Sequence, residues 1–299
     1  MVSGMNQTQN QAKKYLNIGC GKHFHEAWTN IDLVSVSPHV RAYDLRKGLP
    51  YSDNSYDAVY TSHVLEHLSP ETARTSLQEQ FRVVKSGGVI RAVVPDLEGI
   101  AREYLLQLES VAGGNTANEA NYDWMMLELL DQTTRTKVSG IMGDFIMNPA
   151  FSNDEYVASR LGEEVRDWIE AAKYPSHNKT VSAQSNTPSL VAKIRSKSLA
   201  WILQKLRYAV AEALVGITAG GEARQSFREG VFRNSGEIHR WMYDRFSLGR
   251  LLKEVGCTDV QICRHNESRI PDFVSYLLDS TAQGLPRKPD SLYMEGVKP

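Results

Sequence analysis

Small and acidic residues stand where the first three strand-like runs of the chain end. Gly19 and Gly21 follow the first run, Asp32 ends the second, and Asp44 follows the third. Glycine lets a ligand approach the backbone closely, and a carboxylate accepts hydrogen bonds from a ribose diol or an exocyclic adenine amine. In an open α/β sheet such strand ends face the ligand crevice. The pattern predicts an adenosine-type ligand, with its ribose on Asp32 and its adenine on Asp44.

The same residues argue against a nicotinamide dinucleotide. The fingerprint Gly-x-Gly-x-x-Gly needs a third small residue, whereas Phe24 stands at that position. Asp32 comes 13 residues after Gly19, although the fingerprint has its acidic residue about 20 residues further on. We therefore do not expect a dehydrogenase.

A second set of polar residues follows the fourth strand-like run. His63, Glu66 and His67 are spaced i, i+3 and i+4, which places them on one face of a turn. A structural or cofactor-shell role is favoured, and His63 as a general base or substrate contact stays open. A divalent metal is the third interpretation, but this softer ligand set suits magnesium poorly. We predict no metal site.

His239 is the second candidate catalytic residue, beside His63. It opens the segment His239–Asp244, which precedes the last expected helix of the sheet. This approach to a helix N-terminus predicts a position near the rim of the crevice. A capping segment with buried aromatic residues is the alternative interpretation.

The surrounding runs alternate between strand and helix patterns, which is typical of a parallel sheet with crossover connections. One helix is expected to begin at Ser69 as N-cap with Pro70 at its first position, and a later one to be capped by Ser247. The expected strands are Lys14–Ile18, Thr29–Leu33, His39–Tyr43, Tyr56–Thr61, Val89–Val94, Val260–Cys263 and Leu292–Val297, and the expected long helical segments are 99–110, 120–138, 154–172 and 190–217.

These elements predict an α/β fold, namely a Rossmann-like, mostly parallel seven-stranded sheet with helices on both faces. Residues 12–96 and 236–299 are expected to form this core. Residues 97–235 exceed the length of an ordinary loop, so we expect a helical insertion that selects the substrate. A polar stretch near 175–189 within it has the composition of a mobile linker.

Composition narrows the function classes. The 34 Lys and Arg nearly balance the 35 Asp and Glu, so no global field would gather nucleic acid, and a nucleic-acid partner is not expected. Three scattered cysteines suit neither a disulfide framework nor a paired zinc site, which indicates a reducing cytoplasm. No signal peptide and no transmembrane run is expected.

The segment Leu190–Ile217 has an apolar stripe and a basic first half. Core packing with a solvated basic face is the favoured interpretation of this pattern. Peripheral contact with an anionic membrane surface stays open. The stripe consists of Leu199, Ile202, Leu206, Val210, Leu214 and Ile217.

The stretch from Tyr15 to Pro95 resembles the class I methyltransferases of the broad type 11 group. The resemblance lies in Leu-Asn-Ile-Gly-Cys-Gly at 16–21, Asn-Ile-Asp-Leu at 30–33, the run at 56–68 and Phe-Arg-Val-Val-Lys-Ser-Gly-Gly at 81–88. Two residues depart from the group's pattern, Asn17 for an acidic residue and Ser86 for a proline. The resemblance implies S-adenosylmethionine as cofactor, with its methyl toward His63. The implied cofactor-binding residues are Asn17, Gly19, Cys20, Gly21, Asp32, Asp44, Leu45 and His63.

A narrower resemblance covers most of the chain, through residues 122–135, 239–244 and 287–295. It is to a group of bacterial methyltransferases found among polysaccharide-synthesis enzymes. This implies O-methylation of a sugar hydroxyl on a glycan. A small-metabolite acceptor such as a quinol or phenol, and a catalytically silent scaffold, remain as alternatives. The sequence does not indicate the oligomeric state.

Overall fold

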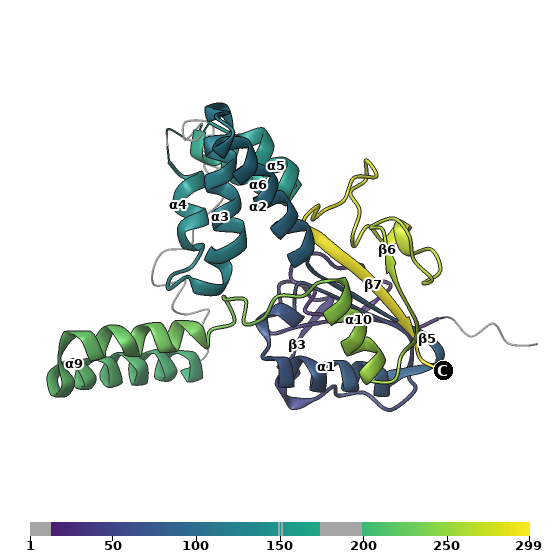
Figure 1. Cartoon of the computed structure of the whole chain (residues 1–299). Coiled ribbons are helices and arrows are strands. Elements are labelled where there is room, and N and C mark those ends of the chain that lie inside the picture. The colour runs from purple at the N-terminus through teal and green to yellow at the C-terminus, as the bar shows by residue number, and fades with distance from the viewer. Residues whose placement is uncertain (1–12, 149, 151, 174–198) are drawn as a thin grey trace, which may run out of the picture. The chain divides into compact units, whose positions relative to one another are not determined.

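The computed structural model describes residues 13–148, 150, 152–173 and 199–299. The chain divides into two compact units (Figure 1). The first comprises residues up to Gly99 together with Arg240–Pro299, and the second comprises Ile100–His239. The expected linker at 175–189 lies outside the described residues.

The first unit is built on a seven-stranded sheet in the order β3-β2-β1-β4-β5-β7-β6. β1 to β5 pair in parallel, whereas β7 is antiparallel to both β5 and β6. The prediction of a mostly parallel sheet is therefore right only in part, and the sheet is mixed. The strands are β1 (Tyr15–Ile18), β2 (Thr29–Asp32), β3 (Val40–Ala42), β4 (Tyr56–Ser62), β5 (Val84–Pro95), β6 (Thr258–Cys263) and β7 (Ser291–Val297).

Two helices cover one face of this sheet. The helix α1 (Pro70–Val83) begins as predicted, since the Ser69 hydroxyl accepts a hydrogen bond from the Thr72 N–H. The helix α10 (Arg245–Glu254) is capped by Asp244 and not by Ser247. Ser247 is the third residue of the reciprocal capping box, which explains why the sequence pattern pointed to it. Short 3-10 turns η1 (Leu45–Lys47) and η2 (Leu65–His67) complete this side.

The other face of the sheet is covered by the connection between β6 and β7. The regular structure of this connection is one short 3-10 helix, η4 (Phe273–Tyr276), so the expectation of helices on both faces is wrong for this connection. Aromatic rings supply the apolar area instead, with Trp28 packed against Tyr60, Phe273 and Tyr276. Rings of this size bury enough surface to form a second core without a helix.

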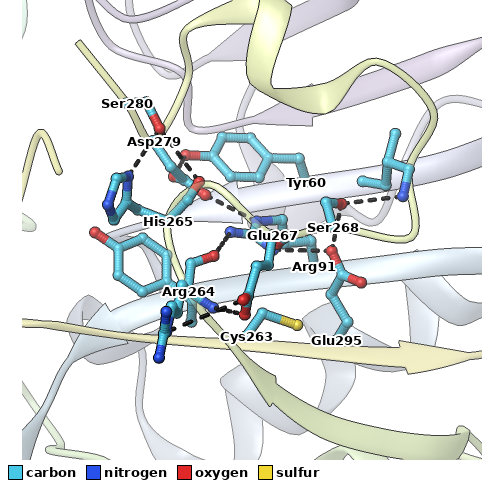
Figure 2. A network of polar contacts seen from close by, with 12 residues as sticks. Tyr60, Arg91, Cys263, Arg264, His265, Glu267, Ser268, Asp279, Ser280 and Glu295 are labelled. Carbon is cyan, nitrogen blue, oxygen red and sulfur yellow. Dashed lines mark hydrogen bonds and ion pairs between the residues drawn. The ribbon is translucent and has the colours of Figure 1, made fainter. Parts of the chain in front are cut away.

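A buried ion network anchors that connection to the sheet (Figure 2). Arg91, in the middle of β5, is fully buried and lies 2.8 Å from both the Asp279 and the Glu295 carboxylates. Its guanidinium also donates to the carbonyls of Arg264 and Glu267. Burial alone would lower the pKa of Arg91, but the two carboxylates raise it above its usual range. The charge is thus fully paired and hydrogen-bonded, as a buried charge must be.

The second unit is helical among its described residues. Trp124 and Met125 are fully buried and belong to its core. The expected helix over 154–172 is broken at Gly162, whose φ of 84° a helix does not allow, and Trp168 is exposed. The expected helix over 120–138 ends at Thr134, and Ser139 and Gly140 then adopt left-handed backbone. The helices are α2 (Leu97–Ala112), η3 (Thr116–Asn118), α3 (Glu119–Thr134), α4 (Gly140–Ile146), α5 (Asp154–Leu161), α6 (Glu163–Lys173) and α9 (Leu199–Arg233).

The last of these helices is a hairpin rather than one straight helix. Gly220 in α9 has φ 88° and ψ −178°, which reverses the chain so that two helical arms run side by side (Figure 1). The first arm therefore ends just before Gly220, close to the predicted end at Ile217, and a second arm that was not predicted continues to Arg233. The expected burial of its apolar stripe is wrong for the described side chains, since Leu206, Val210 and Ile217 are exposed. Among the described residues, no helix is long and apolar enough to cross a membrane.

The Arg91 network yields a stability prediction. Arg91→Ala should lower the free energy of unfolding by about 3–5 kcal/mol, because it leaves two buried carboxylates without their cation. Urea unfolding followed by circular dichroism measures this. Arg250→Ala, at an arginine that is 63 % exposed beside Glu254, is the matched control and should change stability by less than about 1 kcal/mol.

A compensating variant separates charge from packing. The triple substitution Arg91→Met, Asp279→Asn and Glu295→Gln should recover part of the lost stability, because it removes all three buried charges together. A triple variant no more stable than Arg91→Ala would show that the buried charges are not the cause.

Candidate active site at the carboxyl ends of the strands

The predicted glycines and Asp32 meet at the ends of β1 and β2. Gly19 and Gly21 both have left-handed backbone, with φ 65° and 52°. The Gly21 N–H donates to Asp32 Oδ2 at 2.9 Å, and the Gly19 N–H donates to the Ile31 carbonyl at 2.8 Å. A Cβ on Gly19 would lie 2.3 Å from the Val64 side chain, whereas one on Gly21 would have no neighbour within 4 Å. The turn therefore has no room for a side chain at Gly19, where Val64 packs against it, whereas the space beside Gly21 is open.

Asp44 and Leu45 follow at the end of β3. The Asp44 carboxylate caps η1, and the backbone N–H, Nε and Nη2 of Arg46 all donate to it. These hydrogen bonds hold the pKa of Asp44 below its usual range. Leu45 packs against the main core. An adenine amine that donates to Asp44 would therefore share the carboxylate with Arg46, which already donates to it.

Asn17 and Cys20 are buried and serve the protein's own packing. The Asn17 side chain donates to the His23 carbonyl and to Asn30 Oδ1, so it ties β1 to the turn that follows. Its own Oδ1 accepts no hydrogen bond within the described part of the chain. Burial, with Asp32 nearby, raises the pKa of the Cys20 thiol to about 12. Cys20 therefore stays a thiol and does not act as a nucleophile at neutral pH.

His63 occupies a strained position at the end of β4. Its φ of 53° is uncommon for a residue with a side chain, and its N–H donates to the Val93 carbonyl. Its Nδ1 lies 3.4 Å from Glu66 Oε1, and the Nε2 of His67 lies 4.0 Å from the same oxygen. The fully buried Glu66 thus stands between two imidazoles. Such strain is concentrated at functional sites.

Ser291, the first residue of β7, completes this group. Its Oγ lies 2.8 Å from His63 Nε2. Ser291 was not predicted because the sequence indicates the strand Leu292–Val297 but not its antiparallel pairing with β5. The antiparallel pairing puts the start of β7 against the end of β5, with Ser291 opposite Pro95. A hydroxyl, an imidazole and a carboxyl group therefore follow one another as Ser291, His63 and Glu66.

The segment after residue 239 runs beside this group. The N–H groups of Arg240 and Trp241 both donate to the Glu66 carbonyl, and Tyr243 pairs with Asp96 at the end of β5. Trp241 is half exposed, whereas Tyr243 is buried. His239 itself ends the second unit, where it is buried and its N–H donates to the Gln132 carbonyl at 2.8 Å.

Residues 16–92 match the model of one protein family, described as a methyltransferase domain. The match begins in β1 and ends in β5, so it contains the glycine turn, Asp32 and the His63 turn. Residues 16–92 are a methyltransferase domain. The cofactor of this methyltransferase domain is S-adenosylmethionine. Gly21, open on its outer side, and Asp32 beside it fit the adenosyl part of that cofactor.

Solved structures with local similarity include other methyltransferases. One, from Archaeoglobus fulgidus, is 12 % identical over 96 % of this chain and 87 % of its own, with a TM-score of 0.36. The cyclase SpnF is 22 % identical over 27 % of this chain, with a TM-score of 0.23. A putative methyltransferase solved with the Haloferax volcanii Trm112 activator is 16 % identical over 33 % of this chain, with a TM-score of 0.25.

The similarity to two of these structures covers only part of their length. The chain spans 38 % of the cyclase SpnF and 53 % of the putative methyltransferase. All three TM-scores lie below 0.5, so these structures support no argument about the function of this chain. A search of curated proteins finds no match.

The buried Glu66 yields a prediction about pH. Burial raises the pKa of Glu66 to about 8, whereas the unfolded chain has a glutamate pKa of about 4.3. Between these values the unfolded state loses its proton while the folded state keeps it, so stability falls as the pH rises. Glu66→Gln lacks this loss, and its stability relative to the wild type should grow by roughly 2–4 kcal/mol from pH 5 to pH 8.

Chemical unfolding at several pH values measures the effect. Glu170→Gln, at an exposed glutamate of the second unit, is the control and should show a difference that varies little with pH. A Glu66→Gln difference that is equally flat would mean that the folded protein holds Glu66 ionised.

Proposed function

We propose that this S-adenosylmethionine-dependent methyltransferase methylates an oxygen, most specifically a sugar hydroxyl in glycan or polysaccharide synthesis. One observation carries the proposal: His63 Nε2 already forms a hydrogen bond of 2.8 Å with a hydroxyl, that of Ser291, beside the glycine turn. A group that binds one hydroxyl in this way is suited to bind another and take its proton. Acceptor oxygens need such a base, since a neutral hydroxyl is a weak nucleophile.

Each residue of the group has a role in this proposal. With its hydrogen on Nδ1, the His63 ring directs that N–H toward Glu66, and Nε2 is then the ring atom that accepts a proton. Gly19, Gly21 and Asp32 hold the adenosyl part of the cofactor, with Cys20, Asn17, Asp44 and Leu45 supporting the same edge. S-adenosylmethionine supplies an activated methyl group when bound. With the cofactor held by these residues, the acceptor oxygen would receive this methyl group, the electrons of the carbon–sulfur bond would stay on sulfur, and His63 Nε2 would take the proton of the acceptor hydroxyl.

Trp241 supports a sugar as the acceptor. Its ring is 49 % exposed although its backbone N–H is bound to the Glu66 carbonyl. An aromatic face of this kind offers an apolar platform beside polar groups, and sugar rings have both apolar C–H faces and hydroxyls. A quinol or phenol would also stack on Trp241 and is the second candidate acceptor.

The proposal also covers the second unit, the cellular compartment and the partner. We assign substrate selection to the insertion 97–235 and a second catalytic contact to His239. The cysteines Cys20, Cys257 and Cys263 are all free and buried, which suits work in a reducing cytoplasm. A glycan or a small molecule, and not a nucleic acid, is the proposed partner.

Three substitutions separate cofactor binding from chemistry. Asp32→Asn should weaken S-adenosylmethionine binding about ten-fold or more by calorimetry, because one charged acceptor for the ribose is lost. His63→Gln and His239→Ala should slow methyl transfer at least ~100-fold, the usual range for losing a general base, and leave cofactor binding nearly unchanged. His39→Gln, at an exposed histidine, is the matched control with wild-type behaviour.

The acceptor is identified by following labelled methyl groups. The protein is incubated with labelled cofactor and cell extract, and label is expected in the glycan fraction. Label in small aromatic metabolites would favour the second candidate. Calorimetry that shows no binding at millimolar cofactor would leave only a catalytically silent scaffold.

A substitution at Trp241 tests the platform. Trp241→Ala should raise the KM for the acceptor about ten-fold while the affinity for the cofactor stays the same, because stacking area of an aromatic ring is lost. Steady-state kinetics with varied acceptor measures this. Phe246→Ala, at another exposed ring of the same unit, is the control. An unchanged KM in Trp241→Ala would remove Trp241 from the acceptor site.

A further inference from the structure

The first arm of the α9 hairpin carries an exposed aliphatic stripe. Its members follow one another at spacings of three or four residues, so they lie on one side of the helix. Between 47 % and 81 % of each side chain is exposed, and no charged residue interrupts the row. We define the α9 stripe as Leu203, Leu206, Val210, Leu214 and Ile217.

The hairpin does not use this stripe for its own packing. The two arms are joined on another side of the first arm, where Glu212 lies 2.8 Å from Arg224 and 2.6 Å from Arg228 of the second arm. Ala211 and Val215 of the first arm and Phe227 of the second are partly buried. The α9 stripe therefore faces away from the ion pairs that Glu212 forms between the two arms. Such a row of exposed aliphatic residues marks an interaction surface.

Charge indicates what this surface meets. From Ala171 to Ala211 the sequence has no Asp or Glu, whereas it has seven Lys and Arg. Two of these, Lys205 and Arg207, belong to the arm with the α9 stripe. The whole chain is nearly neutral, with a net charge of −1. The basic residues are thus concentrated in the sequence that leads into and through the stripe.

We infer that the α9 hairpin is a peripheral membrane-binding element, with the α9 stripe lying on the apolar boundary of an anionic lipid bilayer. An interfacial helix combines an aliphatic row with adjacent basic residues, and binds more strongly when anionic lipids are present. A second copy of the chain would also cover the row, but a pair of such arms would bring two segments of the same positive charge together. Charge therefore favours the anionic bilayer over a dimer.

Vesicle flotation tests the inference with the full chain. We expect binding to vesicles of phosphatidylcholine with 30 % phosphatidylglycerol, and at least ten-fold weaker binding to phosphatidylcholine alone or in 0.5 M salt. Ile217→Asp and Leu206→Asp should each reduce binding to the anionic vesicles at least ten-fold. Tyr208→Asp, an exposed change on the opposite side of the same arm, is the matched control and should reduce it much less.

Two further measurements keep the outcomes distinct. Circular dichroism melting should show that the variants fold like the wild type, because the substituted side chains are exposed. Light scattering should give the same mass for the wild type and Ile217→Asp. Failure to bind anionic vesicles would overturn the inference, and so would a dimer that Ile217→Asp dissociates, since the stripe would then belong to a second copy. Neither result depends on the identity of the methyl acceptor.

Discussion

One buried cation holds the first unit together. Arg91 lies in the middle of β5 with no exposed surface, so its charge is tolerable only while Asp279 and Glu295 pair with it. Phe273 stacks on the guanidinium at 4.6 Å, and Tyr60 donates to the same Asp279 carboxylate. These contacts bind the irregular connection 264–290 to the sheet in the place that a helix usually takes. A packed network of charge and rings thus replaces regular secondary structure on that face.

The strand that supplies Glu295 to Arg91 also supplies a residue to the candidate active site. Glu295, which pairs with Arg91, and Ser291, which meets His63, are both on β7. The pairing of β7 with β5 sets the register between them, with Glu295 opposite Arg91 and Ser291 opposite Pro95. A shift of this register by one residue would turn both side chains to the other face. The ion pair in the core and the hydrogen bond at the strand end therefore depend on one strand alignment.

The strands and the cofactor edge could be predicted because their signals are local. Apolar runs predicted all seven strands, although β5 begins at Val84 and not at Val89, and Ser69 with Pro70 marked the start of α1. Ser291 and the Arg91 network could not be predicted, because they join residues about 200 positions apart. The break at Gly162 and the reversal at Gly220 depend on single backbone angles that periodicity does not detect. The prediction that the apolar stripe of α9 is buried was wrong for a different reason, because an apolar row has the same sequence pattern whether protein or lipid covers it.

The position of β7 has a consequence for synthesis of the chain. Residues 291–297 insert between β5 and β6, so the central sheet has a gap until they leave the ribosome. Until then Arg91 lacks Glu295, and the ring-rich face stays partly uncovered. Contacts this distant in sequence form slowly, and exposed strand edges favour aggregation in the meantime. The nascent first unit is thus expected to depend on chaperones until β7 has been synthesised, whereas the helical second unit, rich in local contacts, can fold earlier.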